Sequence, residues 1–163
     1  MREWMGLFET TVLRRWVEDN LRLYDQAEYL SDEWHEMIDV HLDDLTEVFF
    51  EPDGSLQIAR ELRFVDATEF VSTLKPGQGL GEYWTFDMHR AHSYSAAKGH
   101  NDKVVIYAKL APEHQQNHDM ISEFLSWGEA EVRLAEGTPI VVTRIVHRGD
   151  DVRSDLVGKQ FHA

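Results

Sequence analysis

The spacing of apolar side chains changes near residue 52, and this change sets what the chain can fold into. Over residues 3–27, apolar side chains recur every three or four positions, which predicts an amphipathic helix. A second helix is predicted after Ser31, whose side chain suits the N-cap position. Beyond the turn signal at residues 52–54, apolar and polar residues mostly alternate in short runs. We therefore expect a helical element over residues 1–51 and a β-rich domain over residues 52–163.

Composition indicates a chain that builds one sizeable core. Of its 163 residues, 42% are hydrophobic and 28% are charged, as in soluble globular proteins. The chain has no cysteine, which excludes disulfides, thiolate catalysis and cysteine-ligated zinc. No run of about 18 apolar residues and no signal-peptide pattern occurs. We expect a cytoplasmic protein with no membrane partner.

Charge is concentrated at the beginning of the chain. The net charge is −14, and residues 1–54 carry fifteen Asp and Glu against four Arg, a net −11. Such a field repels nucleic acid phosphates and favours a basic partner. An acidic surface is also a common means of staying soluble, and the composition leaves both explanations open.

Alternation predicts four main strands in the second part of the chain. They cover residues 55–65, 103–110, 129–134 and 140–146, the last of which is almost continuously apolar. Residues 135–139 contain Gly and Pro and predict a turn. We expect this turn to join the last two strands as a hairpin.

Arg60 occupies an unusual position in the first of these strands. Under an alternating pattern it shares a face with Leu56, Ile58, Leu62 and Phe64. A guanidinium keeps its charge and is costly to bury alone, so Arg60 is expected to face a carboxylate, a phosphate or a wet cleft. A structural ion pair, or a bend that turns the side chain outward, satisfies the pattern equally well.

Two later segments carry further candidates for chemistry. Glu129 and Glu131 are two apart on a predicted strand, so their carboxylates share one face. Arg133 lies on that face too and is a structural partner for either glutamate. Upstream, Gly81 precedes an aromatic cluster of Tyr83, Trp84 and Phe86, with Thr85 inside it. Taken singly, the glutamate pair is also typical of the solvent face of a strand, and the aromatic cluster is typical of core packing.

In this order, the segments resemble the ADP-ribosyltransferase family, in the branch organised around an arginine, a serine/threonine strand and a Glu-x-Glu motif. The resemblance covers about residues 55–148. Its elements are Arg60 in an early strand, the Gly81 to Thr85 segment followed by Ala91 and Tyr94, and the Glu129 to Leu134 strand. Two departures are that no glycine follows Arg60 and that the family's Ser-Thr-Ser is replaced by Tyr83, Trp84 and Thr85.

The resemblance implies an α+β fold in which N-terminal helices pack on an ADP-ribosyltransferase-like split antiparallel β core. It also implies NAD as the substrate that is cleaved and a macromolecular acceptor, expected to be a protein. Glu131 would stabilise the ribose cation, and Glu129 would orient or deprotonate the acceptor. Arg60 would grip a phosphate or ribose oxygen. The remaining NAD-binding residues would be Tyr83, Trp84 and Tyr94, one of whose rings packs on nicotinamide, and Thr85, which steadies the site.

Such compact transferases commonly act as toxins, effectors or phage factors, which again follows from the resemblance alone. Three other interpretations stay open. One is a non-catalytic inhibitor or adaptor of the nucleic-acid-mimic type, whose acidic helices bind a basic surface. Another is a mixed case, in which the acidic helices dock on a basic partner and the β core modifies it. The third is a degenerate transferase that binds NAD without turnover. No metal is predicted. His114 and His118 have the spacing of a metal pair but lack an evident third ligand, so we expect them to be surface histidines. The same expectation applies to His89 and His92.

Overall fold

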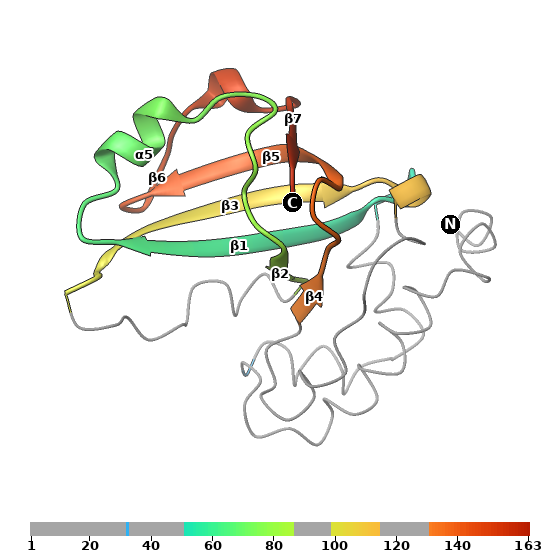
Figure 1. Cartoon of the computed structure of the whole chain (residues 1–163), viewed down its shortest axis with the longest axis horizontal. Helices are drawn as coiled ribbons and strands as arrows, with labels where there is room; N and C mark the ends of the chain where they lie inside the picture. The colour runs from blue at the N-terminus through green and yellow to red at the C-terminus, as the bar shows by residue number, and fades with distance from the viewer. Residues whose placement is uncertain (1–31, 33–50, 87–98, 115–130) are drawn as a thin grey trace.

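The computed structural model describes Asp32 and residues 51–86, 99–114 and 131–163 (Figure 1). The elements are, in chain order, β1 (Leu56–Phe64), α5 (Thr68–Thr73), β2 (Tyr83–Thr85), β3 (Asp102–Leu110), the 3₁₀ turn η2 (Pro112–His114), β4 (Glu131–Arg133), β5 (Pro139–His147), β6 (Asp150–Asp151), the 3₁₀ turn η4 (Ser154–Leu156) and β7 (Gln160–His162). The seven strands form one sheet in the order β4-β2-β1-β3-β5-β6, and β7 pairs with β5. All the strand pairs are antiparallel.

Three long strands form the centre of the sheet and confirm the alternation in the sequence. Residues 55–65, 103–110 and 140–146 were predicted as strands, and they correspond to β1, β3 and β5. β1 and β3 pair along their whole length, from Leu56 opposite Leu110 to Phe64 opposite Asp102. β5 follows β3 with one irregularity, a register shift between Tyr107 and Ala108. These strands give the candidate site a long, continuous support.

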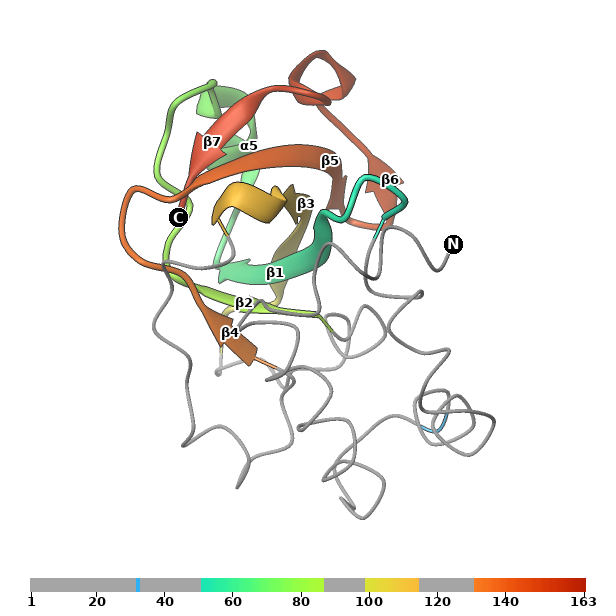
Figure 2. The same ribbon diagram turned by 90° about the vertical axis from the view of Figure 1, so that its right-hand side faces the viewer.

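The sheet curves into a half-barrel, and its inner side holds the main core (Figure 2). Leu56 and Ile58 of β1 are buried there, and Leu62 and Phe64 pack against the same cluster. From the rest of the described chain the core takes Ala67, Val71, Leu74, Leu80, Trp84, Phe86, Val104, Ile106, Ala108, Leu110, Leu134, Ile140, Val142, Ile145, Leu156, Phe161 and Ala163. A second, small cluster of Ala59 and Val105 lies on the opposite side of the sheet, with Tyr107 and Val146 packed against it.

The α-helix α5 is short and is held at both ends by groups from distant parts of the chain. At its start, Asp102 accepts a hydrogen bond from the Ala67 N–H at 2.7 Å. At its end, Arg153 donates to the Val71 carbonyl at 2.7 Å. Six residues are too few for a stable helix by themselves. Tertiary contacts therefore supply the stability that helix propensity cannot.

The expected architecture, an α+β fold with N-terminal helices packed on a split β core, is wrong. Of the described residues, 44% are in strands and 15% are helical, and the sheet is a single curved half-barrel. The curved sheet packs its inner side against itself. Buried residues of α5 and of the segment that contains η4 and β7 complete the cover of this side. The physical reason is that these elements already bury the apolar face that helices from elsewhere were expected to cover. Apart from Asp32, which is helical and exposed, the predicted N-terminal helices lie outside the described residues.

The expected hairpin between residues 129–134 and 140–146 is also wrong. β4 pairs with β2, whereas β5 pairs with β3, β6 and β7. The intervening residues do form a turn, in which Thr138 N–H donates to the Ala135 carbonyl at 3.1 Å. This turn carries the chain from the β4 edge to β5, across the opening of the half-barrel.

No helix in the described ranges has the length and apolar character that crossing a membrane requires.

Candidate functional site

Three segments that are far apart in the sequence form neighbouring strands at one side of the sheet. β2 lies between β4 and β1, so that Thr85 pairs with Glu131 on one side and with Ala59 on the other. Both Figure 1 and Figure 2 show β2 and β4 next to each other below β1. The arginine, threonine and glutamate segments of the sequence motif are thus brought into contact by the strand order.

The register assigns the motif residues to two adjacent cross-strand rows. One row runs through Glu131, Thr85 and Ala59. Arg60 is the next residue along β1, and the next row on the β2–β4 side pairs Trp84 with Val132. Successive rows alternate between the two sides of the sheet, so a ligand that meets both Arg60 and Glu131 must reach around the edge of the sheet. Among the described strands, β4 is the last on this side of the sheet, so both rows end at the edge of the sheet.

Arg60 is partly exposed and lies against a glycine that leaves room for it. Its Nη1 donates to the Tyr83 carbonyl at 2.9 Å. A Cβ atom at Gly81 would lie 2.7 Å from Cζ and Nη1 of Arg60, and Gly81 has a φ of +97°. Only glycine combines this backbone conformation with so close an approach. Gly81 therefore leaves the space that the Arg60 guanidinium occupies, in addition to forming one end of a turn.

Tyr83 is the exposed aromatic residue of the site. Its side chain is 47% exposed, and the Arg133 guanidinium carbon lies 5.7 Å from the ring centroid. Arg133 also donates from Nε to Glu82 Oε2 at 3.1 Å. These contacts fix the Arg133 head near the ring. The ring nevertheless keeps exposed surface on which a planar group can stack.

Trp84 and Thr85 are buried, unlike Tyr83. Trp84 is 1% exposed within the main core, and its indole N–H donates to the Gly81 carbonyl at 2.8 Å. Such a ring has no surface left for a nicotinamide, so stacking in this part of the site falls to Tyr83. Thr85 is 4% exposed, which suits a residue that holds the strand in place.

Two of the predicted site residues, Glu129 and Tyr94, lie outside the described residues, as do three of the histidines considered as metal ligands, His89, His92 and His118. His114 belongs to η2, at the end of β3. In the described ranges, no three His, Asp or Glu side chains gather into a group that could hold a metal ion.

Glu61, next to Arg60 on β1, is a buried carboxylate paired with two partly exposed cations. Its side chain is 1% exposed and lies 2.5 Å from Arg63 Nη2 and 3.8 Å from Lys103 Nζ. Burial raises the pKa of the Glu61 carboxyl, although Arg63 and Lys103 oppose this shift. These ion pairs tie β1 to β3 beside the candidate site.

The register adds two residues that the sequence analysis did not single out. Ala59 pairs with Tyr107 and Tyr107 with Arg144, so the row that begins at Glu131 continues across five strands. The Arg144 guanidinium carbon lies 5.6 Å from the Tyr107 ring centroid. A charged residue inside the apolar run 140–146 is the same kind of signal as Arg60, and it was available in the sequence.

No protein-family model, no curated protein and no solved structure matches this chain. The function is therefore inferred from the motif order and from the geometry of the described residues.

Proposed function

We propose that the protein is a mono-ADP-ribosyltransferase that uses NAD to modify a macromolecule, most simply a protein side chain met in the cytoplasm. The observation that carries the proposal is the strand order β4-β2-β1, with Thr85 paired to both Ala59 and Glu131. Segments separated by tens of residues become neighbouring strands, which supports the proposal. The exposed ring of Tyr83 on the middle strand is a second support.

The reaction breaks the bond between C1′ of the ribose and the nicotinamide nitrogen. Nicotinamide leaves with the bonding electrons, which neutralise its positive charge, while the ribose takes on oxocarbenium character. Glu131 would accept a hydrogen bond from the ribose 2′-hydroxyl and stabilise this charge. Tyr83 would stack against the nicotinamide, and Arg60 would hold a phosphate or ribose oxygen.

Transfer is completed when a nucleophile of the acceptor bonds to C1′. Its proton passes to Glu129, the proposed base, and then to solvent. If water is the nucleophile, the products are ADP-ribose and nicotinamide. Glu129→Gln should therefore spare NAD hydrolysis while it impairs transfer, and equal loss of both activities would rule out this division of roles.

The test is release of nicotinamide from NAD by the purified chain. We expect Glu131→Gln to lower the rate by about a hundredfold or more, the usual effect of removing a group that stabilises transition-state charge. Glu136→Gln is the matched control, because Glu136 is an exposed glutamate in the turn after β4. Labelled NAD offered with a cell extract should pass label to a macromolecule. Equal rates in the two variants would refute the proposal.

The concentration of acid in residues 1–54, a net −11, favours a second candidate, a non-catalytic adaptor or inhibitor that binds a basic surface. Binding of that kind depends on the acidic side chains and is indifferent to Glu131. A protein that captures its partner with Glu131→Gln in place, and releases no nicotinamide, would be such an adaptor. A protein that binds NAD through Arg60 without releasing nicotinamide would be a degenerate transferase.

A further inference from the structure

A hollow of about 370 Å³ lies between the beginning of β3 and the end of β5. Its lining consists of three cationic residues, Lys103, Arg144 and Arg148, with Val105, Val146 and Gly149. Among the described residues the lining contains no carboxylate, although each cation pairs with one outside the lining: Lys103 with Glu61, Arg144 with Asp151 and Arg148 with Asp102. A second hollow of about 420 Å³, at the opposite end of the sheet, is lined by both signs of charge, including Asp53, Glu113 and Lys109. Of these two hollows, the first has the more cationic lining and is the better candidate for an anion.

Arg144 is oriented before any ligand arrives. Its Nε donates to Asp151 Oδ1 at 2.6 Å, and its guanidinium lies over the Tyr107 ring. Among the described residues, these contacts leave the two Nη nitrogens without a hydrogen-bond partner. Because Arg144 and Asp151 are both more than half exposed, their ion pair is weak and gives way to a stronger acceptor.

Arg148 has a left-handed backbone conformation that arginine rarely adopts. It has a φ of +53° and precedes Gly149, with a φ of +85°, in the two-residue turn between β5 and β6. Such turns favour Asn or Gly at the first position. Nε and Nη2 of Arg148 bind the two Asp102 oxygens at 3.1 and 2.8 Å, so Nη1 is left to other acceptors. Asp102, which also lies 2.9 Å from His147 Nε2, thus fixes the guanidinium at the rim of the hollow.

We infer that this hollow binds a phosphate or diphosphate group. Two planar guanidinium forks with unused donors and one lysine match the oxygen-rich, multiply charged surface of such a group. Val105 and Val146, which pair with each other, form an apolar floor between the cations. The inference does not depend on the proposed transferase activity.

The phosphate group that binds the hollow could belong to either of two molecules. The row of paired residues that starts at the candidate site reaches the hollow at Arg144. From Thr85 to Arg144 the row crosses three strand spacings, about 14 Å at about 4.8 Å each. The diphosphate of NAD bound along this row is one source. A separate phosphorylated molecule is the other.

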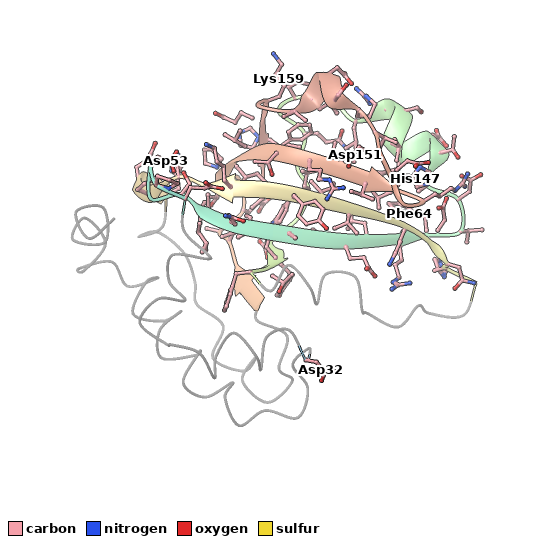
Figure 3. All side chains as sticks on the ribbon, turned by 180° about the vertical axis from the view of Figure 1, so that it is seen from behind. Asp32, Asp53, Phe64, His147, Asp151 and Lys159 are labelled. Carbon is pink, nitrogen blue, oxygen red and sulfur yellow. The ribbon has the colours of Figure 1, made fainter. Side chains whose placement is uncertain are left out.

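The test is calorimetric titration of pyrophosphate into the full chain at low ionic strength. We expect Arg144→Gln and Lys103→Gln each to weaken binding by about tenfold, since each removes a charged contact. Lys159→Gln is the control, because Lys159 is exposed and does not line the hollow; Figure 3 shows it well apart from His147. It should bind as the parent does. If Arg144→Gln fails to fold, as judged by circular dichroism, Lys103→Gln carries the test.

Competition identifies the source. If NAD supplies the phosphate, NAD competes with pyrophosphate and Arg144→Gln weakens both; if a separate molecule supplies it, NAD binding is unchanged. Either result supports the site. No pyrophosphate binding, or equal binding by the Lys103, Arg144 and Lys159 variants, would overturn it. Pyrophosphate binding without nicotinamide release would instead refute the transferase and leave this site in place.

Discussion

Asp102 joins three separate parts of the structure through one carboxylate. It binds Arg148 at two positions, accepts the Ala67 N–H at the start of α5, and lies 2.9 Å from His147 Nε2. Its side chain is 9% exposed. These hydrogen bonds, from Arg148 first and then from the Ala67 N–H and His147, hold the pKa of Asp102 far below its ordinary value of 3.8.

Asp102 should therefore make stability depend on acid pH. A carboxyl whose folded pKa is depressed stabilises the fold above its unfolded pKa, and this contribution is lost as the pH falls through the folded pKa. We predict that Asp102→Asn lowers the free energy of unfolding at pH 7, and that the difference from the parent shrinks below about pH 4. Urea unfolding at several pH values measures it. Asp150→Asn, an exposed aspartate nearby, is the control, and a difference independent of pH would contradict the assignment.

Gly81 is predicted to matter for both stability and NAD binding. In Gly81→Ala, the φ of +97° is strained and the new methyl group displaces the Arg60 guanidinium. We expect a loss of about 1 kcal/mol or more in stability and weaker binding of NAD. Gly79→Ala is a close control, because nothing lies within 4 Å of its Cβ position. Thermal unfolding and NAD titration measure the two effects, and unchanged NAD affinity would show that Arg60 does not bind it.

At the scale of elements, α5 depends on Arg153. Nη1 of Arg153 donates to the Val71 and Ser72 carbonyls at 2.7 and 3.3 Å, while Nε and Nη2 bind Asp155 at 3.0 Å each. Arg153 thus satisfies carbonyls at the helix end that have no intrahelical partner.

We predict that Arg153→Ala destabilises the protein by about 2 kcal/mol, the range for hydrogen bonds from a charged donor, and speeds hydrogen exchange at the Val71 and Leu74 amides. Arg153→Lys keeps the charge without the planar fork and should restore only part of the loss. Exchange that is unchanged in both variants would show that α5 is held by packing alone.

The same elements show which parts of the fold local sequence could predict. β1, β3 and β5 each have a strong periodicity, because one face of each strand packs in the core, and all three were predicted. The pairing of β4 with β2 depends on residues about fifty apart, so periodicity could not reveal it, and chain proximity wrongly suggested a hairpin with β5. α5 was missed because its stability comes from Asp102 and Arg153, which local propensity does not register.

For the candidate site, the sequence supplied the residue types and the structure supplied their alignment. Arg60 was singled out by its place among apolar neighbours, which the core on that side of β1 confirms. The close contact of Arg60 with Gly81 depends on the φ angle of Gly81, +97°, which could not be predicted from the sequence. Trp84 and Tyr83 look alike in sequence, but one is buried and the other is exposed, since adjacent residues of a strand face opposite sides.

At the scale of the whole molecule, the acidic N-terminal residues and the candidate site are expected to carry separate functions. Replacing Asp43, Asp44 and Glu47 with Asn, Asn and Gln removes three of the negative charges in residues 1–54. If these residues serve a basic partner, retention on immobilised polylysine should fall in the variant, and the dependence of retention on salt should become less steep.

The same triple variant should release nicotinamide from NAD at the parent rate, within about twofold, if catalysis belongs to Arg60 and Glu131. Glu131→Gln gives the reciprocal result, in which polylysine retention is kept and nicotinamide release is lost. Measuring both properties on both variants separates the two functions. Loss of nicotinamide release in the triple variant, with circular dichroism unchanged, would mean that the acidic segment takes part in the reaction.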